Sequence, residues 1–145
     1  MKSITSAITS VRGYVPETVL TNFDLEKMVD TNNEWIISRT GIKERRILKN
    51  KSLGTSFMAI NAANKLLQEK DVDPTSIDLV IVSTATPDMP VSSTASFVAT
   101  EIGASNAFGY DIQGACSGFL FGMSAACAHI CSCLLYTSDA ADDVY

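Results

Sequence analysis

Between residues 55 and 112, segments with apolar residues at helical spacing alternate with segments in which apolar residues are continuous. From Thr55 to about Lys70, apolar side chains recur at helical spacing, and Asp73-Pro74 closes the segment. Residues 77–84 are a nearly continuous apolar run, the pattern of a strand buried on both faces of a parallel sheet. The pattern therefore predicts an amphipathic helix followed by a buried strand.

The same alternation continues toward the end of the chain. Residues 93–102 read as a second helix that starts near Ser93 and ends at Gly103, and residues 107–112 read as a strand. Small residues at 114–118 then turn the chain into an apolar helix over about 117–131. Strands that alternate with helices predict parallel pairing through right-handed crossovers, with ligands outside the carboxyl ends of the strands.

The first fifty residues predict shorter elements. Residues 5–13 are rich in β-branched side chains and read as a strand, and residues 22–29 read as a short helix. The spacing of Thr31 and Glu34 is that of a capping box, which predicts a second helix that begins at Thr31 and is stopped by Gly41. Residues 42–48 are expected to be extended and exposed.

Composition narrows the function classes. The chain has 145 residues, of which 46% are hydrophobic and 19% charged, so it has the size and balance of about one globular domain. A net charge of -5 gives no basic surface for nucleic acid or for an anionic membrane. We find neither a secretory leader nor a membrane-spanning window, and we therefore expect a cytoplasmic protein.

Four cysteines lie between residues 116 and 133, and one of them stands out. Clustering of this kind fits reduced thiols better than a disulfide scaffold. Cys116 is in the sequence GACSG, where a strand turns into a helix, and unpaired amides at a helix N-terminus favour a thiolate and a developing oxyanion. The residues alone leave two interpretations of Cys116 open, a nucleophile or a small buried hydrophobic residue.

Three longer segments carry a family resemblance. DIQGACSGF (111–119), LTNFDLEKMVDTNNEWIISRTGIKERR (20–46) and TATPD (84–88) are similar to segments of 3-oxoacyl-acyl carrier protein synthase III, a condensing enzyme of the thiolase superfamily. The resemblance covers residues 4–131. It implies an α/β fold that forms the N-terminal, incomplete half of a thiolase-like α-β-α architecture with a mainly parallel sheet. Residues 1–131 would form this half domain, and residues 132–145 a tail that is non-native or disordered.

The resemblance also assigns site residues. It implies that Cys116 is the acyl-accepting nucleophile and that Thr31, Trp35 and Arg39 hold the adenine of coenzyme A. If the helix reaches Thr31, the spacing i, i+4, i+8 places all three on one face. Without the resemblance, Trp35 reads as a core anchor, Arg39 as a solvated charge and Thr31 as a helix cap.

The activity that the resemblance implies is an acyl transfer that initiates fatty-acid synthesis. An acyl group, typically acetyl, passes from coenzyme A to the cysteine and is then condensed with malonyl-acyl carrier protein as carbon dioxide leaves. The acyl-CoA and the malonyl-carrier protein are substrates, no cofactor is implied, and the full-length enzyme is a homodimer. The family's catalytic His and Asn belong to a second half that is missing here, so the chain itself is predicted to be inactive.

Two alternatives to this function remain open. One is another thiolase-fold starter synthase, which loads the same cysteine but uses a different acceptor. The other is a non-catalytic fragment. The acyl-chain preference also stays open, because Val91-Ser92 stands where many family members have Phe-Pro in a loop that reaches across the dimer.

A metal site is not expected from the cysteine cluster. On a helix, Cys127 and Cys131 share one face, whereas His129 points away from them. Cys133 belongs to the suspect tail. The prediction is therefore a buried helix that uses small residues, with no metal.

Overall fold

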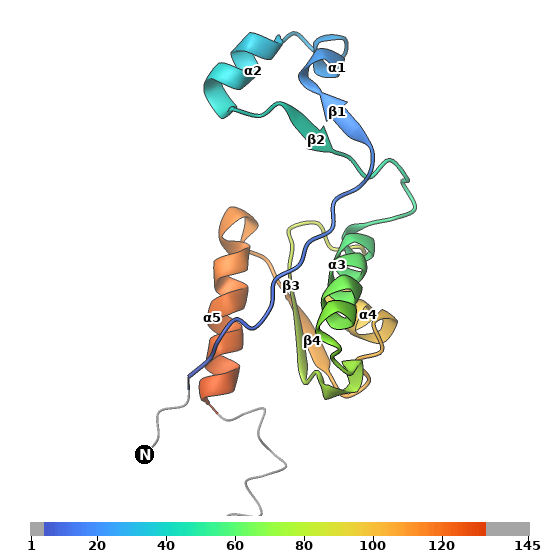
Figure 1. The fold of residues 1–145 in the computed structure, drawn as a ribbon, viewed down its shortest axis with the longest axis vertical. Coiled ribbons are helices and arrows are strands. Elements are labelled where there is room, and N and C mark those ends of the chain that lie inside the picture. Colours follow the sequence, from blue (N-terminus) through green and yellow to red (C-terminus); the bar gives the residue numbers. More distant parts are fainter. Residues whose placement is uncertain (1–4, 133–145) are drawn as a thin grey trace, which may run out of the picture. The chain divides into compact units, whose positions relative to one another are not determined.

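The computed structural model describes residues 5–132, which form two compact units (Figure 1). The smaller unit consists of residues 14–54, and the larger unit of residues 5–13 and 55–132. A single half domain over 1–131 stays a prediction. Residues 133–145 of the proposed tail lie outside the described residues.

The larger unit contains the predicted alternation of helices and strands. In order, these are α3 (Thr55–Lys70), a 3-10 turn (Pro74–Ser76), β3 (Leu79–Ser83), α4 (Thr94–Glu101), β4 (Phe108–Ile112), a second 3-10 turn (Ala115–Ser117) and α5 (Gly118–Cys131). Each predicted element between residues 55 and 131 is confirmed to within two residues. The Ser93 side chain caps α4 and Gly103 follows its end with φ 80°, as its position predicts.

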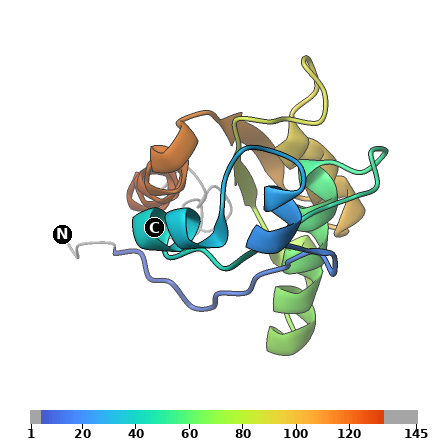
Figure 2. The same cartoon turned by 90° about the horizontal axis from the view of Figure 1, so that it is seen from above.

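Strands β3 and β4 pair in parallel, with Leu79 opposite Phe108 and Ser83 opposite Ile112. Helix α4 contacts both strands and packs against α3, and α5 covers the other face of the pair (Figures 1 and 2). The larger unit is therefore layered α-β-α, as expected. Both strands end at the same edge, and the turn that carries Cys116 follows β4 directly.

The core of the larger unit lies mainly beneath α4. Ala95, Val98, Ala99 and Ala104 are at most 4% exposed. Strand β3 is only half buried over residues 79–82, so the prediction that it is buried on both faces was wrong. Among the described residues the sheet has two strands, so one edge of β3 has no neighbouring strand to cover it.

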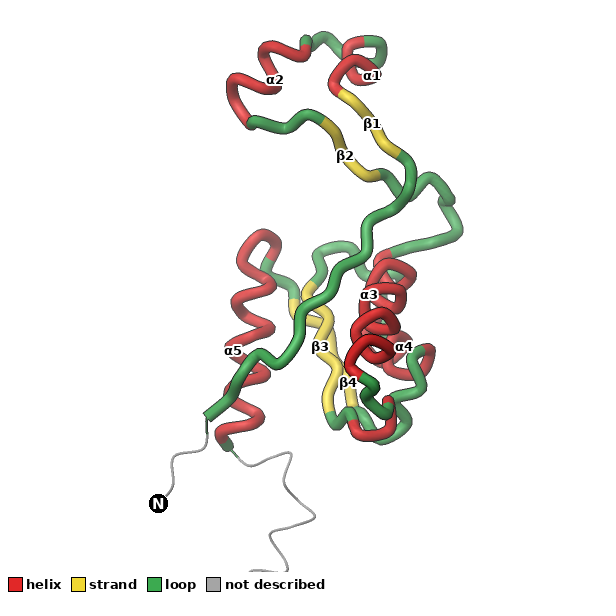
Figure 3. The backbone as a smooth tube through the Cα atoms, viewed as in Figure 1, coloured by secondary structure: helices red, strands yellow, loops and turns green. Residues whose placement is uncertain are grey.

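The strand predicted at residues 5–13 was also wrong, because this segment is irregular (Figure 3). None of the described strands pairs with it, and a strand requires a neighbour to bond its amides and carbonyls. The segment is held by side chains instead. The Ser6 hydroxyl donates to the Cys127 sulfur of α5 at 3.1 Å, and Arg12 forms an ion pair with Glu69 of α3.

The smaller unit is a hairpin with two helices between its strands. The strands β1 (Val19–Thr21) and β2 (Glu44–Arg46) are antiparallel, and α1 (Asn22–Glu26) and α2 (Asn33–Thr40) lie between them in sequence. Both predicted helices are present, although α1 is shorter than the expected 22–29. As predicted, Gly41 ends α2 in the left-handed conformation, with φ 70°.

A buried asparagine joins the parts of the smaller unit. Asn22 is 1% exposed, and its amide nitrogen donates to the Asn33 side chain and to the Ile42 carbonyl. Its side-chain oxygen accepts from Arg45 of β2. A buried amide with all of these partners fixes the ends of both helices relative to β2.

Candidate active site

Cys116 lies in the turn that connects β4 to α5. This turn is a short 3-10 segment of residues 115–117, closed by the Ser117 amide, which donates to the Gly114 carbonyl at 2.9 Å. The thiol is exposed, and α5 begins two residues later. No side chain of the described residues caps the first turn of α5. The first amide of the helix, that of Gly118, donates to the Ala115 carbonyl, and the positive end of the helix dipole lies next to Cys116 along the chain.

The backbone of this turn is strained at one position. Ala115 has φ 42°, a left-handed conformation that costs a residue with a side chain free energy. The left-handed conformation is not at a glycine, because neither Gly114 nor Gly118 has a positive φ. Position 114 requires glycine for a different reason, because there is no room for a side chain there. A Cβ atom built there would lie 2.5 Å from Cδ2 of Phe121.

Two carboxylates that the sequence reasoning missed fix the ends of the strands. Asp111, next to last in β4, accepts hydrogen bonds from the amides of Thr94 and Ala95, both at 2.8 Å. Asp88 accepts from the amide of Ser56 at the start of α3. Asp111 lies near the end of an apolar strand and Asp88 in the loop after one, and these positions were the available signal. Together they tie the carboxyl ends of the sheet to the helix starts.

These contacts change the acidity of Asp111. Burial alone would raise its pKa, but the amides of Thr94 and Ala95 and the Ser93 hydroxyl hold the pKa below the ordinary value of 3.8. The folded state then binds a proton at Asp111 less tightly than the unfolded state. The stabilisation is therefore fully present above the ordinary pKa and is lost as the pH falls through the lower, folded-state value.

Asp111→Asn is expected to lower the stability of the larger unit by about 1 kcal/mol at neutral pH, because it removes one acceptor and the charge at the start of α4. Chemical denaturation at neutral pH, and again at a pH well below the ordinary pKa of 3.8, measures the difference from the unaltered chain. The difference should shrink in acid. Asp30→Asn, at an exposed position, controls for the loss of one charge. An unchanged difference in acid would contradict the role of the Asp111 charge.

The groups near the end of α5 do not converge. The sulfurs of Cys127 and Cys131 are 3.9 Å apart, whereas Nε2 of His129 is 2.9 Å from the Tyr110 hydroxyl on β4. His129 thus lies on another face of the helix, as its position predicts. Within residues 5–132 no three His, Cys, Asp or Glu side chains are grouped so that they could hold a metal ion. The absence of a metal remains a prediction for the whole chain.

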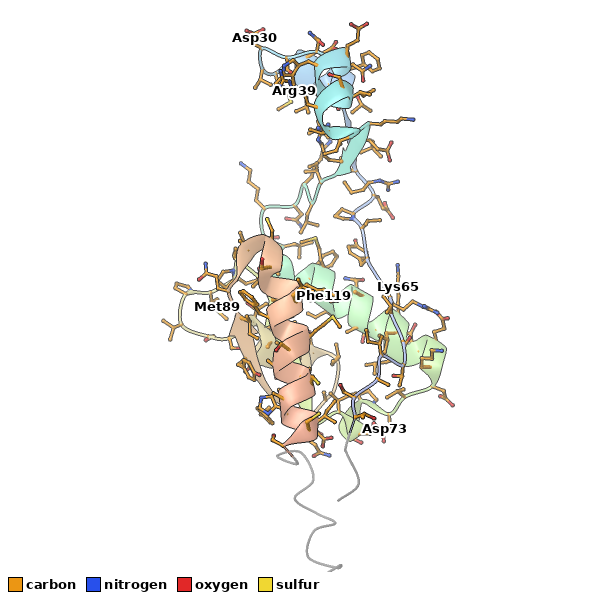
Figure 4. The ribbon with its side chains drawn as sticks, turned by 90° about the vertical axis from the view of Figure 1, so that its left-hand side faces the viewer. Asp30, Arg39, Lys65, Asp73, Met89 and Phe119 are labelled. Carbon is orange, nitrogen blue, oxygen red and sulfur yellow. The ribbon has the colours of Figure 1, made fainter. Side chains whose placement is uncertain are left out.

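The smaller unit carries the residues assigned to coenzyme A. Trp35 and Arg39 are one helical turn apart on α2, and the Arg39 guanidinium carbon lies 5.1 Å from the centre of the indole (Figure 4 labels Arg39). Trp35 is 53% exposed, so it is not a core anchor in this unit. An exposed indole stacked with a guanidinium is a surface on which a flat base can bind.

The structure corrects the position of Thr31. The cap of α2 is Asn32, whose side chain accepts from the Trp35 amide at 2.8 Å, and the helix begins at Asn33. Thr31 therefore lies before the helix, and the proposed helical face shared by Thr31, Trp35 and Arg39 does not include it. Asn caps a helix as well as Thr does, so the capping-box spacing pointed one residue too early.

The layering and the turn together define a class of protein. A parallel sheet between helices, with an exposed cysteine where a strand ends and a helix begins, is the arrangement of a thiolase-like fold.

No family model matches the chain. None of the helices described in residues 5–132 is long and apolar enough to cross a membrane.

Curated proteins and solved structures give the family. The chain is 52% identical over 132 residues to beta-ketoacyl-acyl carrier protein synthase III of Phocaeicola vulgatus, and 51% identical over 126 residues to the second such protein of Bacteroides thetaiotaomicron. These matches cover 91% and 87% of this chain but 40% and 38% of the relatives. The chain thus spans about two fifths of the length of these relatives.

Solved structures of synthase III enzymes are also similar to this chain. The 3-oxoacyl-acyl carrier protein synthase III of Aquifex aeolicus has a TM-score of 0.79 at 46% identity, over 84% of this chain and 39% of that one. The synthase III of Thermus thermophilus has a TM-score of 0.83 at 40% identity, over 89% and 40%. The chain belongs to the beta-ketoacyl-acyl carrier protein synthase III family.

Proposed function

We propose that these residues form the acyl-accepting part of an enzyme that starts fatty-acid synthesis. The observation that carries this proposal is the exposed thiol of Cys116 at the start of α5, within a region that is 52% identical to a beta-ketoacyl-acyl carrier protein synthase III. The substrates are an acyl-CoA, typically acetyl-CoA, and malonyl-acyl carrier protein. The reaction takes place in the cytoplasm, on a homodimer, and needs no cofactor.

The first step is transfer of the acyl group to Cys116. Cys116 loses its proton to solvent, and the thiolate attacks the carbonyl carbon of the acyl-CoA to form a new carbon–sulfur bond. The thioester bond to coenzyme A breaks, and coenzyme A leaves as a thiolate that takes up a proton from solvent. Helix α5 begins two residues after Cys116, and the positive end of its dipole favours negative charge on the carbonyl oxygen. These are the contributions that the described residues of the larger unit can make.

The second step needs groups that this chain does not supply. Malonyl-acyl carrier protein loses carbon dioxide, and the resulting carbanion attacks the acyl-cysteine, which releases the thiolate and a 3-oxoacyl-carrier protein. The family's His and Asn promote this step. The only histidine here is His129, and it lies at the far end of α5, bonded to Tyr110. The chain by itself is therefore proposed to catalyse no condensation.

Mass spectrometry after incubation with acetyl-CoA tests this function. We expect one acetyl group on the peptide that contains Cys116, and no malonyl-dependent product when malonyl-acyl carrier protein is added. Circular dichroism confirms that the chain is folded during the assay. A folded chain with no acetyl adduct would contradict the loading step. Turnover in the condensation assay would contradict the assignment of the second step to missing residues.

Trp35 and Arg39 are proposed to bind the adenine of coenzyme A, with Thr31 nearby in sequence. A base held between the two side chains needs two stacking gaps of about 3.5 Å each, or about 7 Å in all. The guanidinium lies 5.1 Å from the indole centre, so this space is not open. Binding between them would require Arg39 to move outward from the ring.

Trp35→Ala is expected to weaken coenzyme A binding by about five- to thirtyfold, since a stacking contact of about 1–2 kcal/mol is lost. Arg39→Ala should have a smaller effect of the same sign. Titration calorimetry measures both, and the fluorescence of Trp35, the only tryptophan, reports on the site directly in the unaltered chain and in Arg39→Ala.

Phe23→Ala is the matched control for these variants, because it removes another exposed aromatic side chain from the same unit. It should leave the affinity unchanged. Equal weakening by Phe23→Ala and Trp35→Ala would indicate a general effect on the unit and would contradict a specific adenine site.

A starter synthase of another pathway is the second candidate. The priming beta-ketosynthase of the R1128 polyketide pathway shares 36% identity with this chain, with a TM-score of 0.79. The higher identity to the synthase III proteins of Phocaeicola vulgatus and Bacteroides thetaiotaomicron, 52% and 51%, favours fatty-acid synthesis. Val91 lies in the loop that the family resemblance links to acyl-chain choice, and it is 96% exposed. Its contacts within this protein chain therefore do not limit the length of the acyl group. Competition between acetyl-CoA and longer acyl-CoA primers for Cys116 distinguishes these two candidate functions.

A further inference from the structure

Phe121 contacts the turn that carries Cys116. It lies in the first turns of α5, and side chains of a helix lean toward its N-terminus, which brings the ring back over Gly114. A Cβ atom built on Gly114 would lie 2.5 Å and 2.7 Å from the ring atoms Cδ2 and Cε2. The ring therefore packs directly against the backbone of Gly114.

Gly114 is enclosed from a second side as well. The same Cβ position is 3.1 Å from the Cα atom of Gly118, the first residue of α5. The backbone of Gly114 thus fits between the start of the helix and the ring of Phe121. The next residue, Ala115, is in the left-handed conformation, which persists only where the surrounding structure enforces it.

We propose that Phe121 is a positioning residue for Cys116. Its ring holds Gly114 against the start of α5, and this contact keeps Ala115 left-handed and the thiol in place in the turn before the helix. Phe121 touches neither the substrate nor the sulfur in this role. The inference deepens the proposed acyl transfer and rests on it only for what Cys116 does once it is positioned.

The proposal sets the direction of the expected effect. Without the ring, Ala115 can relax from its strained conformation, and the thiol moves away from the start of α5. The reactivity of Cys116 should then fall, although its exposure does not. Phe119 provides a contrast, since it is 69% exposed on the same helix (labelled in Figure 4) and supplies none of the three atoms nearest to a Cβ built on Gly114.

Alkylation by iodoacetamide tests this in the 145-residue chain, with peptide mapping to separate the cysteines. Cys127 and Cys131 are exposed and serve as references within the same molecule. In Phe121→Ala, the ratio of the Cys116 rate to the Cys127 rate should fall by about two- to fivefold, the range for losing one helix-terminus interaction. Phe121→Tyr keeps the ring and should restore the ratio, and Phe119→Ala should leave it unchanged.

Gly114→Ala provides an independent test of the contact. It should lower the same ratio, and combining it with Phe121→Ala should add little, because both substitutions remove one shared packing arrangement. A normal ratio in Phe121→Ala, or fully additive effects in the double variant, would overturn the proposal. If circular dichroism shows Phe121→Ala to be unfolded, Phe121→Leu takes its place with the same expected direction.

This test is separate from that of the proposed function, because alkylation needs no acyl-CoA. If the unaltered chain fails to accept an acetyl group while the ratio still depends on Phe121, acyl transfer fails and the positioning role stands. If the chain is acetylated and the ratio does not depend on Phe121, the positioning role fails and acyl transfer stands.

Discussion

Cys116→Ala is expected to abolish acylation of the chain by acetyl-CoA. Among residues 5–132, the substitution removes the only thiol at the start of a helix, so no nucleophile remains in the turn to attack the thioester. Labelling should fall by about 10³-fold or more, which is the size of loss seen when a nucleophile is removed. Intact-mass measurement followed by peptide mapping quantifies the adduct.

Two variants make this expectation specific. Cys127→Ala removes an exposed thiol near the other end of α5 and should leave acylation of Cys116 unchanged. Cys116→Ser keeps the shape but replaces the thiol by a weaker nucleophile, so it should behave like Cys116→Ala. Undiminished labelling of Cys116→Ala, or transfer of the label to Cys127 at the same rate, would show that the acyl group does not depend on the turn.

Gly109→Val is expected to destabilise the larger unit by about 1–3 kcal/mol, even though valine favours strands. Gly109 lies in β4, where the strand passes close to the start of α4. A Cβ atom there would lie 3.1 Å from the backbone carbonyl carbon of Ala95 and 3.2 Å from the Ser96 amide nitrogen. Backbone cannot rotate away as a side chain can, so α4 and β4 must move apart.

Chemical denaturation measures this effect, and Gly13→Val is the matched control because a Cβ atom at Gly13 meets nothing within 4 Å. Since β4 leads directly to the turn, Gly109→Val should also lower acylation of Cys116. Equal stability of Gly109→Val and Gly13→Val would show that the close packing of α4 on β4 is not required.

The pattern of apolar residues predicted the larger unit well because its signals are local. The period of α3, the apolar run of β3 and the caps at Ser93 and Gly103 each depend on residues within a few positions of one another. The prediction of a strand at residues 5–13 was wrong because a strand depends on a partner that is distant in sequence. β-branched composition favours an extended chain, but only a partner strand makes it part of a sheet.

The candidate site was predicted in part. The sequence located Cys116 in a turn before a helix and placed Trp35 and Arg39 one helical turn apart, and the structure has both arrangements. It put the cap of α2 at Thr31 instead of Asn32, because Thr and Asn are equivalent caps and the spacing alone could not choose between them. The roles of these residues in binding and acyl transfer stay proposals.

The sequence by itself determined the order of the elements in the larger unit and the position of its thiol at a helix start, because periodicity, caps and turns act between near neighbours. Only the tertiary structure decided that Asp111 holds the start of α4 and that the β4 backbone touches α4 at Gly109. These partners are more than twelve residues apart, and no local pattern encodes them. They meet only because the packed sheet and helices offset the entropy of closing the loops between them.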